Sequence, residues 1–406
     1  MSLALTLRRL WHHETVWRFV DALAPRGFGF LVHTWLIWRF GPESYALAAW
    51  TITTFGLMNS FIPDPSGYVL LASTTARAKR RIRLFTPWLW GKTLLGVSVT
   101  LTIAFLFAGP LVDAAPPGVA TWTLAGSTAF AVAETLWAAC GTNRFATGHL
   151  IAWAGWGVVL RIGALSAALA LDALTEAGIG EMLLVLSMPL LFACILALPL
   201  PRVGRRSLVA GLITLKRYSL WTQANGFLLM LMAQAPVFFA GTSPTLAPAA
   251  TGQLAYMVRV LNLIVQPLMI LQSVIVRDYA RLKAVTSGFR FYRLIYRGAG
   301  LLMIAATALF AWLAPSIAPT LWLIGLGLAL FTSFRFEFAL LNALRDVRFL
   351  SLHVFLPVTL IFVFIALPLH ESVLGVATAT AAGHAVLTVL LILQARQRIV
   401  TEWKNI

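Results

Sequence analysis

A succession of long apolar segments runs through this chain from Val16 to Leu393, and it restricts the possible fold more than any other feature. Short polar or basic stretches separate the segments. A helix needs about 20 mainly apolar residues to cross roughly 30 Å of hydrocarbon, and the chain offers about twelve such segments. The predicted helices cover 16–39, 45–72, 87–112, 119–141, 149–171, 181–200, 219–241, 250–276, 296–316, 320–343, 349–369 and 373–395.

The balance of apolar and charged residues supports the same reading. Hydrophobic residues make up 60% of the chain and charged residues 11%, whereas soluble domains carry about 25% charged residues. We therefore predict an all-α, polytopic membrane protein with about twelve transmembrane helices.

The basic residues fall almost entirely on one side of the predicted bundle. Short cytoplasmic loops of membrane proteins carry an excess of Lys and Arg. With the N-terminus inside, the cytoplasmic segments include 77–83, 202–217 and 277–297, whereas the opposite loops hold Arg39 alone. This asymmetry accounts for nearly all of the formal net charge of +17, so it does not indicate a nucleic-acid partner. We expect a bacterial inner-membrane protein with both termini in the cytoplasm.

The basic stretch in the middle of the chain divides the helices into two equal sets. We predict an N-terminal six-helix lobe at 1–200, a cytoplasmic basic linker at 201–218, and a C-terminal six-helix lobe with a short tail at 219–406. Because six is even, a duplication would place the two halves in parallel orientation. The helix count alone suggests this repeat.

The sequence gives little indication of a metal site, a cofactor site or an enzyme active site. Cys140 and Cys194 lie in predicted spans without CxxC or Cys/His spacing, so we expect neither a disulfide nor a metal site. Every predicted outer loop is short, and no pair of carboxylates lies at a helix mouth. A membrane-embedded glycan-processing enzyme is therefore the least favoured function, and no cofactor is expected.

Charged side chains within the predicted spans are the most informative residues. A charge at the centre of a membrane helix costs roughly 2.5–3.5 kcal/mol, so it usually faces a partner or a water-filled cavity. These residues are Asp21, Arg26, Asp64, Lys92, Glu134, Arg161, Arg259, Arg335 and Glu337.

The first predicted helix combines a basic and an imidazole side chain on one face. Arg26 and His33 are seven residues apart, so they share nearly one face of a helix, and Asp21 lies off that face. We interpret Arg26 and His33 as cavity residues, with Asp21 able to pair with Arg18. A buried ion pair of Arg26 with Asp64 or another acid is the alternative.

The second predicted helix contains an acid between two prolines. In FIPDPSG at 61–67, Pro63 and Pro65 flank Asp64 and remove backbone donors, which kinks or opens a helix. Irregular backbone at membrane depth is tolerated where it lines a cavity or is packed in protein. Asp64 is therefore our main acidic candidate, for cargo binding or ion coupling.

Further polar candidates lie in the predicted helices at 219–241 and 250–276. Asn225, Arg259 and Asn262 stand among several glutamines there. One amide between membrane helices usually contributes only to packing, but this density indicates a polar interior. We assign Asn225, Arg259 and Asn262 to cargo binding.

Two stretches of the chain resemble a known family. RFGPESYALAAW at 39–50 is similar to the segment joining the first two helices in polysaccharide and O-antigen (Wzx-type) flippases of the multidrug/oligosaccharidyl-lipid/polysaccharide exporter superfamily. ATGQLAYMVRVLNLIVQPLMILQSVIVRDYARL at 250–282 resembles their eighth helix, although its tyrosine is out of step with the family pattern. Helix count and loop lengths extend the resemblance over the whole chain.

This resemblance implies a function. It implies two lobes around a central V-shaped cavity that opens alternately to each side of the membrane, with a polyprenyl-diphosphate-linked oligosaccharide as cargo. The cargo would pass from the inner to the outer leaflet for cell-surface or exopolysaccharide assembly, with a polysaccharide polymerase or glycosyltransferase as partner. Arg26 and Arg259 would bind the diphosphate, because guanidinium matches phosphate in a forked geometry.

A cation-coupled drug antiporter of the same superfamily is the alternative function. It would favour acids over arginines in the cavity. Asp21, Asp64 and Glu134 keep this alternative open as candidates for ion coupling.

Overall fold

A computed structural model describes most of the chain, and every regular element in the described part is helical. The described residues are 14–62, 75–115, 118–147, 149–198, 204–214, 220–282, 286–343, 347–369 and 372–404. The predicted all-α class and the multi-pass membrane character are confirmed. Asp64 lies outside these residues.

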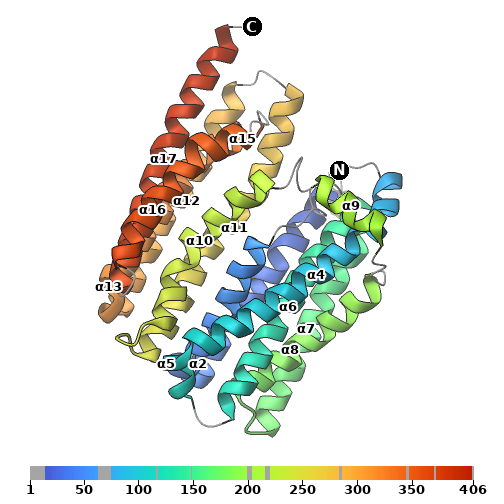
Figure 1. Ribbon diagram of the computed structural model, residues 1–406, viewed down its shortest axis with the longest axis vertical. Coiled ribbons are helices and arrows are strands. Elements are labelled where there is room, and N and C mark those ends of the chain that lie inside the picture. Colours follow the sequence, from blue (N-terminus) through green and yellow to red (C-terminus); the bar gives the residue numbers. More distant parts are fainter. Residues whose placement is uncertain are drawn as a thin grey trace, which may run out of the picture. The chain divides into compact units, whose positions relative to one another are not determined.

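The chain folds into two compact units, with the division after Gln223 (Figure 1). Unit 1 comprises Met1–Gln223 and unit 2 comprises Ala224–Ile406. The helices of unit 1 are α2 (Glu14–Phe61), α4 (Thr75–Phe107), α5 (Gly109–Asp113), α6 (Val119–Ala146), α7 (Leu150–Leu174), α8 (Ile179–Ala197) and α9 (Arg205–Thr214).

The division lies within α10, so unit 2 begins at the fifth residue of that helix. Its elements are α10 (Leu220–Thr242), α11 (Pro248–Leu282), α12 (Thr286–Leu313), the short helix η2 (Pro315–Ile317), α13 (Ala318–Ser333), α14 (Arg335–Ala343), α15 (Val347–Leu350), the π-helical turn η3 (Ser351–Phe355), α16 (Leu356–Leu369) and α17 (Val373–Lys404).

Eight helical segments of the described chain are long and apolar enough to cross a membrane. They lie in α4, α7, α8, α10, α12, η2 with α13, η3 with α16, and α17. The helices α2, α6 and α11 are not among the eight, and they carry Arg26, Glu134 and Arg259 respectively. Charged residues of this kind lower the hydropathy of a helix.

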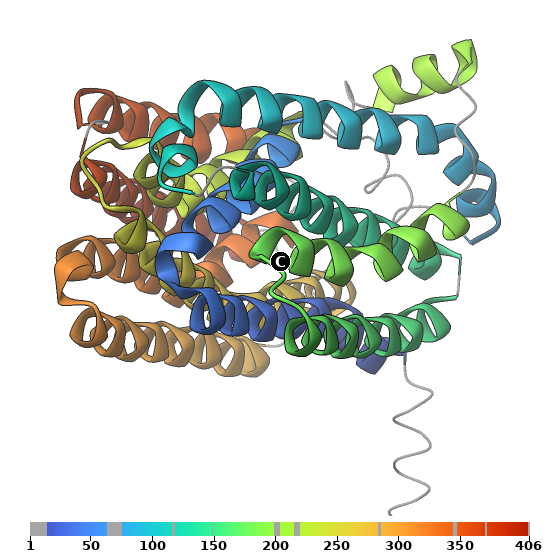
Figure 2. The same ribbon diagram turned by 90° about the horizontal axis from the view of Figure 1, so that it is seen from below.

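A single glycine separates the first two predicted helices. The run α2 contains one non-helical residue, Gly41, with φ 77° and ψ 164°. This left-handed φ is accessible to glycine at little steric cost. Figure 2 shows the two segments of α2, dark blue before the glycine and lighter blue after it, running in different directions. Near this corner, Arg39 donates hydrogen bonds to Asp172 on α7 at 3.0 and 3.1 Å.

Two glycines bring α6 and α8 into backbone contact in unit 1. A Cβ added to Gly126 would overlap the carbonyl of Gly180, and one added to Gly180 would overlap the backbone of Trp122. Close approach of this kind needs small residues at the interface. Helices α6 and α8 therefore form a tight seam, which is visible in Figure 1.

The same register recurs in unit 2. A Cβ added to Gly327 on α13 would lie 3.1 Å from the Cα of Ala381 on α17. Gly126 and Gly180 are 54 residues apart in the sequence, as are Gly327 and Ala381. Adding 201 to the residue numbers of the first pair gives those of the second pair. Each unit thus contains one helix pair with the same sequence offset.

Each unit has a hydrophobic core of aromatic and aliphatic side chains. In unit 1, Trp137 and Trp153 stack with ring centroids 4.0 Å apart, and Leu190 packs in the same cluster. In unit 2, Phe338 packs edge-on against Phe355, and Leu391 belongs to that cluster. Trp137 and Phe338, and likewise Leu190 and Leu391, are again 201 residues apart.

The predicted linker contains a helix. The stretch predicted as a linker, 201–218, contains the ten-residue helix α9. This helix contacts α4, so it belongs to unit 1.

Candidate functional site

A buried cluster of charged side chains lies inside unit 1, between α2, α6 and α7. Its centre is Arg161 on α7, which is 2% exposed. The Nη2 of Arg161 donates a hydrogen bond to Oε2 of Glu134 on α6 at 2.8 Å, forming a salt bridge. An arginine buried to this degree requires such a partner because an isolated charge in a protein interior is costly.

Aromatic rings and a backbone carbonyl complete the surroundings of Arg161. Its guanidinium lies over the ring of Trp137 at 5.0 Å and over that of Phe28 at 5.9 Å, both within the range of cation–π attraction. Its Nη1 donates to the carbonyl of Gly157, one turn earlier, at 3.3 Å. A Cβ on Gly157 would lie 2.5 Å from the Trp137 ring and 3.2 Å from that Nη1, so glycine leaves room for both the indole and the guanidinium.

A second acid and a second arginine join the cluster from α2. Asp21 is half-buried and interacts electrostatically with Arg161 and Arg26. Its carboxylate rests on the α6 backbone, because a Cβ added to Gly141 would lie 2.7 Å from Asp21 Oδ2. Asp21, Arg26, Glu134 and Arg161 therefore form a group with two negative and two positive formal charges.

Several polar atoms of this group have unused hydrogen-bonding capacity. Asp21 Oδ1, Glu134 Oε1 and Arg161 Nε are buried and have no hydrogen-bond partner within the part of the chain that the structure describes. Buried polar groups are normally paired, so such atoms need an explanation. Carboxylate oxygens in this state are suited to accept a proton, a cation or a water molecule.

The other candidate on α2 has different surroundings. His33 is 4% exposed, and its ring packs edge-on against Tyr45 at 5.7 Å and Phe130 at 6.0 Å. The seven-residue spacing suggested that His33 shares the cavity face of Arg26. These rings belong to the second segment of α2 and to α6, and the shared cavity face stays a prediction.

The three unit 2 candidates occupy two helices. On α10, Asn225 is buried, and its Oδ1 accepts a hydrogen bond from Ser351 Oγ at 2.8 Å. On α11, Arg259 and Asn262 are half-buried and three residues apart, which makes them neighbours on the helix surface. Asn262 Nδ2 is buried and has no hydrogen-bond partner among the described residues.

A basic group lies where α12 and α14 meet in unit 2. Arg335 is 6% exposed and stands over the ring of Phe331 at 5.3 Å. Arg293 Nε is 3.2 Å from Glu337 Oε1. The hydroxyl of Tyr296 donates to the carbonyl of Leu268 at 2.9 Å, which ties α12 to α11.

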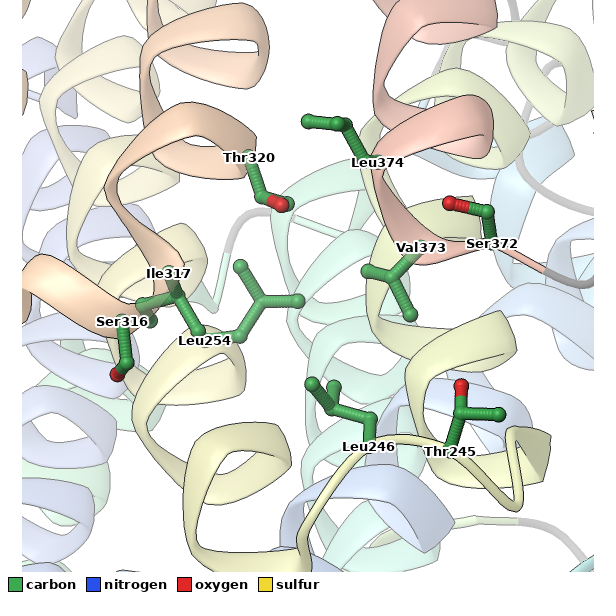
Figure 3. Close-up of a pocket in the computed structure, with 9 residues that line it drawn as sticks. All are labelled: Thr245, Leu246, Leu254, Ser316, Ile317, Thr320, Ser372, Val373 and Leu374. Atoms are coloured by element: carbon green, nitrogen blue, oxygen red, sulfur yellow. The ribbon is translucent and has the colours of Figure 1, made fainter.

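Unit 2 also contains an uncharged pocket of about 460 Å³ (Figure 3). The described residues that line it come from the α10–α11 connection, α11, η2, α13 and the start of α17. Thr320 and Ser372 point their hydroxyls into this space, between aliphatic side chains such as Leu254 and Val373 (Figure 3). No sequence feature predicted this pocket.

Sequence reasoning also missed the pairing at the centre of the unit 1 cluster. Glu134 and Arg161 were recognised as charges in neighbouring predicted spans, but Arg161 received no role. Opposite charges in consecutive spans were the available signal, because each needs a partner inside the membrane. His384 on α17 was also missed: it is 1% exposed, with Nδ1 3.0 Å from the carbonyl oxygen of Thr380.

The described residues contain no group of three or more His, Cys, Asp or Glu side chains placed to hold a metal ion. Cys140 and Cys194 are buried free thiols in the core of unit 1.

Comparison with known proteins gives weak structural likenesses. No family model matches the chain, and no curated protein matches it. One similar solved structure is a MATE in complex with MaL6, at 13% identity and a TM-score of 0.47, over 96% of this chain and 93% of that chain. Another is the outward-facing conformation of a multidrug resistance MATE family transporter of the MOP superfamily, at 15% identity and a TM-score of 0.46, with the same coverage.

Proposed function

We propose that this chain is an inner-membrane transporter that moves a polyprenyl-diphosphate-linked oligosaccharide from the inner to the outer leaflet by alternating access. The observation that carries the proposal is the presence of arginines within the apolar helices of unit 2. Arg259 on α11 is half-buried, and Arg335 on α14 is 6% exposed. A guanidinium in such a place suits an anionic cargo.

The arginines of α2 and α11 are the proposed diphosphate ligands. Arg26 and Arg259 are both half-buried in helices that carry charge within otherwise apolar sequence. A guanidinium presents planar, forked donors that match phosphate oxygens, and it stays charged when it is partly buried. Arg26 already interacts with Asp21, so cargo binding would compete with that contact.

The uncharged part of the cargo calls for different chemistry. Sugar hydroxyls both donate and accept hydrogen bonds, and so do the hydroxyls of Thr320 and Ser372 in the unit 2 pocket. Asn225 and Asn262 add amide groups to the same unit. The isoprenoid tail would remain in the lipid.

The cluster in unit 1 is the proposed coupling element. Asp21 and Glu134 each keep a buried carboxylate oxygen without a hydrogen-bond partner in the described chain. Binding of a proton or cation there would change which acid Arg161 pairs with, and such a switch can bias two conformations. This observation also favours the second candidate function, a cation-coupled drug antiporter, which would use the same acids but a positively charged cargo.

The test is to measure lipid-linked glycan in cells that carry Arg26→Ala, Arg259→Ala or both, at equal membrane abundance. We expect each variant to accumulate glycan on the inner leaflet, and Lys at either position to rescue only partly, because it lacks the planar fork. Arg39→Ala is the matched control, since Arg39 is half-exposed and pairs with Asp172. Normal export by the double variant would overturn the proposed anion site, and loss of drug efflux instead would favour the antiporter.

The proposed function also implies partner proteins. A flipped lipid-linked glycan must be built on the inner side and consumed on the outer side of the membrane. A glycosyltransferase and a polysaccharide polymerase are the corresponding classes of partner.

A further inference from the structure

The short helix α9 has an unusual distribution of side chains. Its buried residues are small, namely Ser207, Gly211 and Thr214, at the spacing of one helix face. Its large aliphatic residues point away from the protein: the exposed fractions are 48% for Leu208, 46% for Val209, 59% for Leu212 and 52% for Ile213. In a water-soluble helix this pattern would be reversed.

The buried face of α9 is fixed to α4. Trp88 Nε1 donates a hydrogen bond to the carbonyl of Ser207 at 3.0 Å, and Ser207 Oγ donates to the carbonyl of Leu84 at 2.5 Å. A Cβ added to Gly211 would overlap the indole of Trp88. In Figure 1 the helix lies crosswise to α4. These contacts hold the aliphatic face of α9 outward.

The membrane is the environment that this outward face fits. Ten residues of helix span about 15 Å, roughly half of the hydrocarbon thickness, so α9 cannot cross the bilayer. It follows α8 and precedes α10, both of which can. A short helix between two spans, with an aliphatic face exposed, is suited to lie in the plane of the interface.

The charges around α9 select one kind of lipid. Arg205 and Arg206 are exposed at its first turn, and Arg83 is exposed on the neighbouring α4. The sequence from 198 to 221 contains five basic residues and no acidic one. Positive charge at the membrane surface attracts anionic headgroups.

We propose that α9 is an interfacial helix that inserts Leu208, Val209, Leu212 and Ile213 into the leaflet on the predicted cytoplasmic side, with Arg205 and Arg206 on anionic lipid headgroups. The helix then couples unit 1 to that leaflet and holds the start of the connection to unit 2 at the membrane surface. This inference does not depend on the identity of the cargo.

Spin labels on single cysteines test the insertion. In the full chain with Cys140→Ala and Cys194→Ala, reconstituted in phosphatidylglycerol nanodiscs, labels at Leu212→Cys and Ile213→Cys should be accessible to oxygen and shielded from a water-soluble nickel reagent. Leu101→Cys on the exposed face of α4 gives the lipid reference, and Glu176→Cys in the α7–α8 connection gives the water reference. Nickel accessibility at 212 and 213 equal to that at 176 would overturn the insertion. Protection from both reagents would mean that protein covers this face, and would overturn it as well.

Lipid selectivity tests the arginines. In mixed phosphatidylglycerol and phosphatidylcholine membranes, we expect Arg205→Gln and Arg206→Gln each to lower the association of phosphatidylglycerol with the protein about 5-fold, from roughly 1 kcal/mol per basic residue at a membrane surface. Arg396→Gln, an exposed arginine on α17, is the matched control. Equal losses from Arg396→Gln and the α9 variants would overturn the specific assignment.

Discussion

The two units share a helix register but bury charge in different ways. Glu134 on α6 and Arg335 at the start of α14 are 201 residues apart, the same shift that relates Gly126 to Gly327. In unit 1 the acid meets Arg161 at 2.8 Å. In unit 2 an arginine takes the corresponding place and stands over Phe331. The seam residues are alike in size, and the charges are opposite in sign.

The comparison distinguishes the small residues that pack each unit from the charged residues that can bind a ligand. The register depends on small residues that let backbones touch, and the two units carry different side chains eight residues, or about two turns, further along the helix. The charged positions give unit 1 a formally neutral cluster of two acids and two arginines, and they give unit 2 Arg259, Arg335 and the Arg293–Glu337 pair. A neutral cluster suits reversible ion binding, and buried or half-buried arginines suit an anionic cargo.

The largest expected effect comes from breaking the buried pair of unit 1. Arg161→Ala leaves Glu134 as an unpaired charge, which costs about 3–5 kcal/mol of unfolding free energy when a buried pair loses one partner. We expect a marked drop in the melting temperature of the purified protein in detergent. The Arg161→Ala, Glu134→Gln double variant should recover part of that loss, because the remaining group is neutral. A double variant no more stable than Arg161→Ala would argue against the pair as the cause.

The glycine seams should show a smaller and graded effect. Gly126→Ala forces a Cβ into the Gly180 backbone, and overpacking of this kind costs about 1–3 kcal/mol. Gly327→Ala should cost less, since its nearest neighbours would be 3.1 and 3.3 Å away and one of them is the His384 side chain.

Gly163→Ala on α7 is the control for both seam variants, because nothing lies within 4 Å of the added Cβ. Helix propensity then predicts a gain of up to about 1 kcal/mol. Equal melting temperatures for Gly126→Ala and Gly163→Ala would contradict the close contact between α6 and α8.

The smallest effect is expected for the ion pair of unit 2. The Arg293 side chain is 40% exposed, against 3% for Arg161, so solvent screens its attraction to Glu337. Arg297 and Arg396 also interact electrostatically with Glu337, so this acid keeps positive neighbours when Arg293 is removed. Pairs of this kind contribute about 0.2–1 kcal/mol. We expect Arg293→Ala to lower the melting temperature only slightly, and to lose its effect at high salt. A loss as large as that of Arg161→Ala would remove the distinction between the two pairs.

Local features of the sequence predicted most of the helices. Apolar segment length predicted the helices of both units, and FGP at 40–42 marked the corner that Gly41 makes. Helix α9 was missed because Pro201, Gly204 and the basic residues read as a linker. The paired aliphatic residues 208/212 and 209/213, at a spacing of four, were the signal for it.

The sequence by itself determined the membrane class, the helical segments and the charged residues that must find partners, because hydropathy and helix length are properties of a single segment. Only the tertiary structure decided which charges meet. Glu134 and Arg161 come together, and His33 lies beside Tyr45 and Phe130, because of the rotation of each helix about its axis and its distance from its neighbours. Those quantities depend on packing at residues such as Gly126 and Gly180, where the absence of a side chain sets how closely two backbones approach.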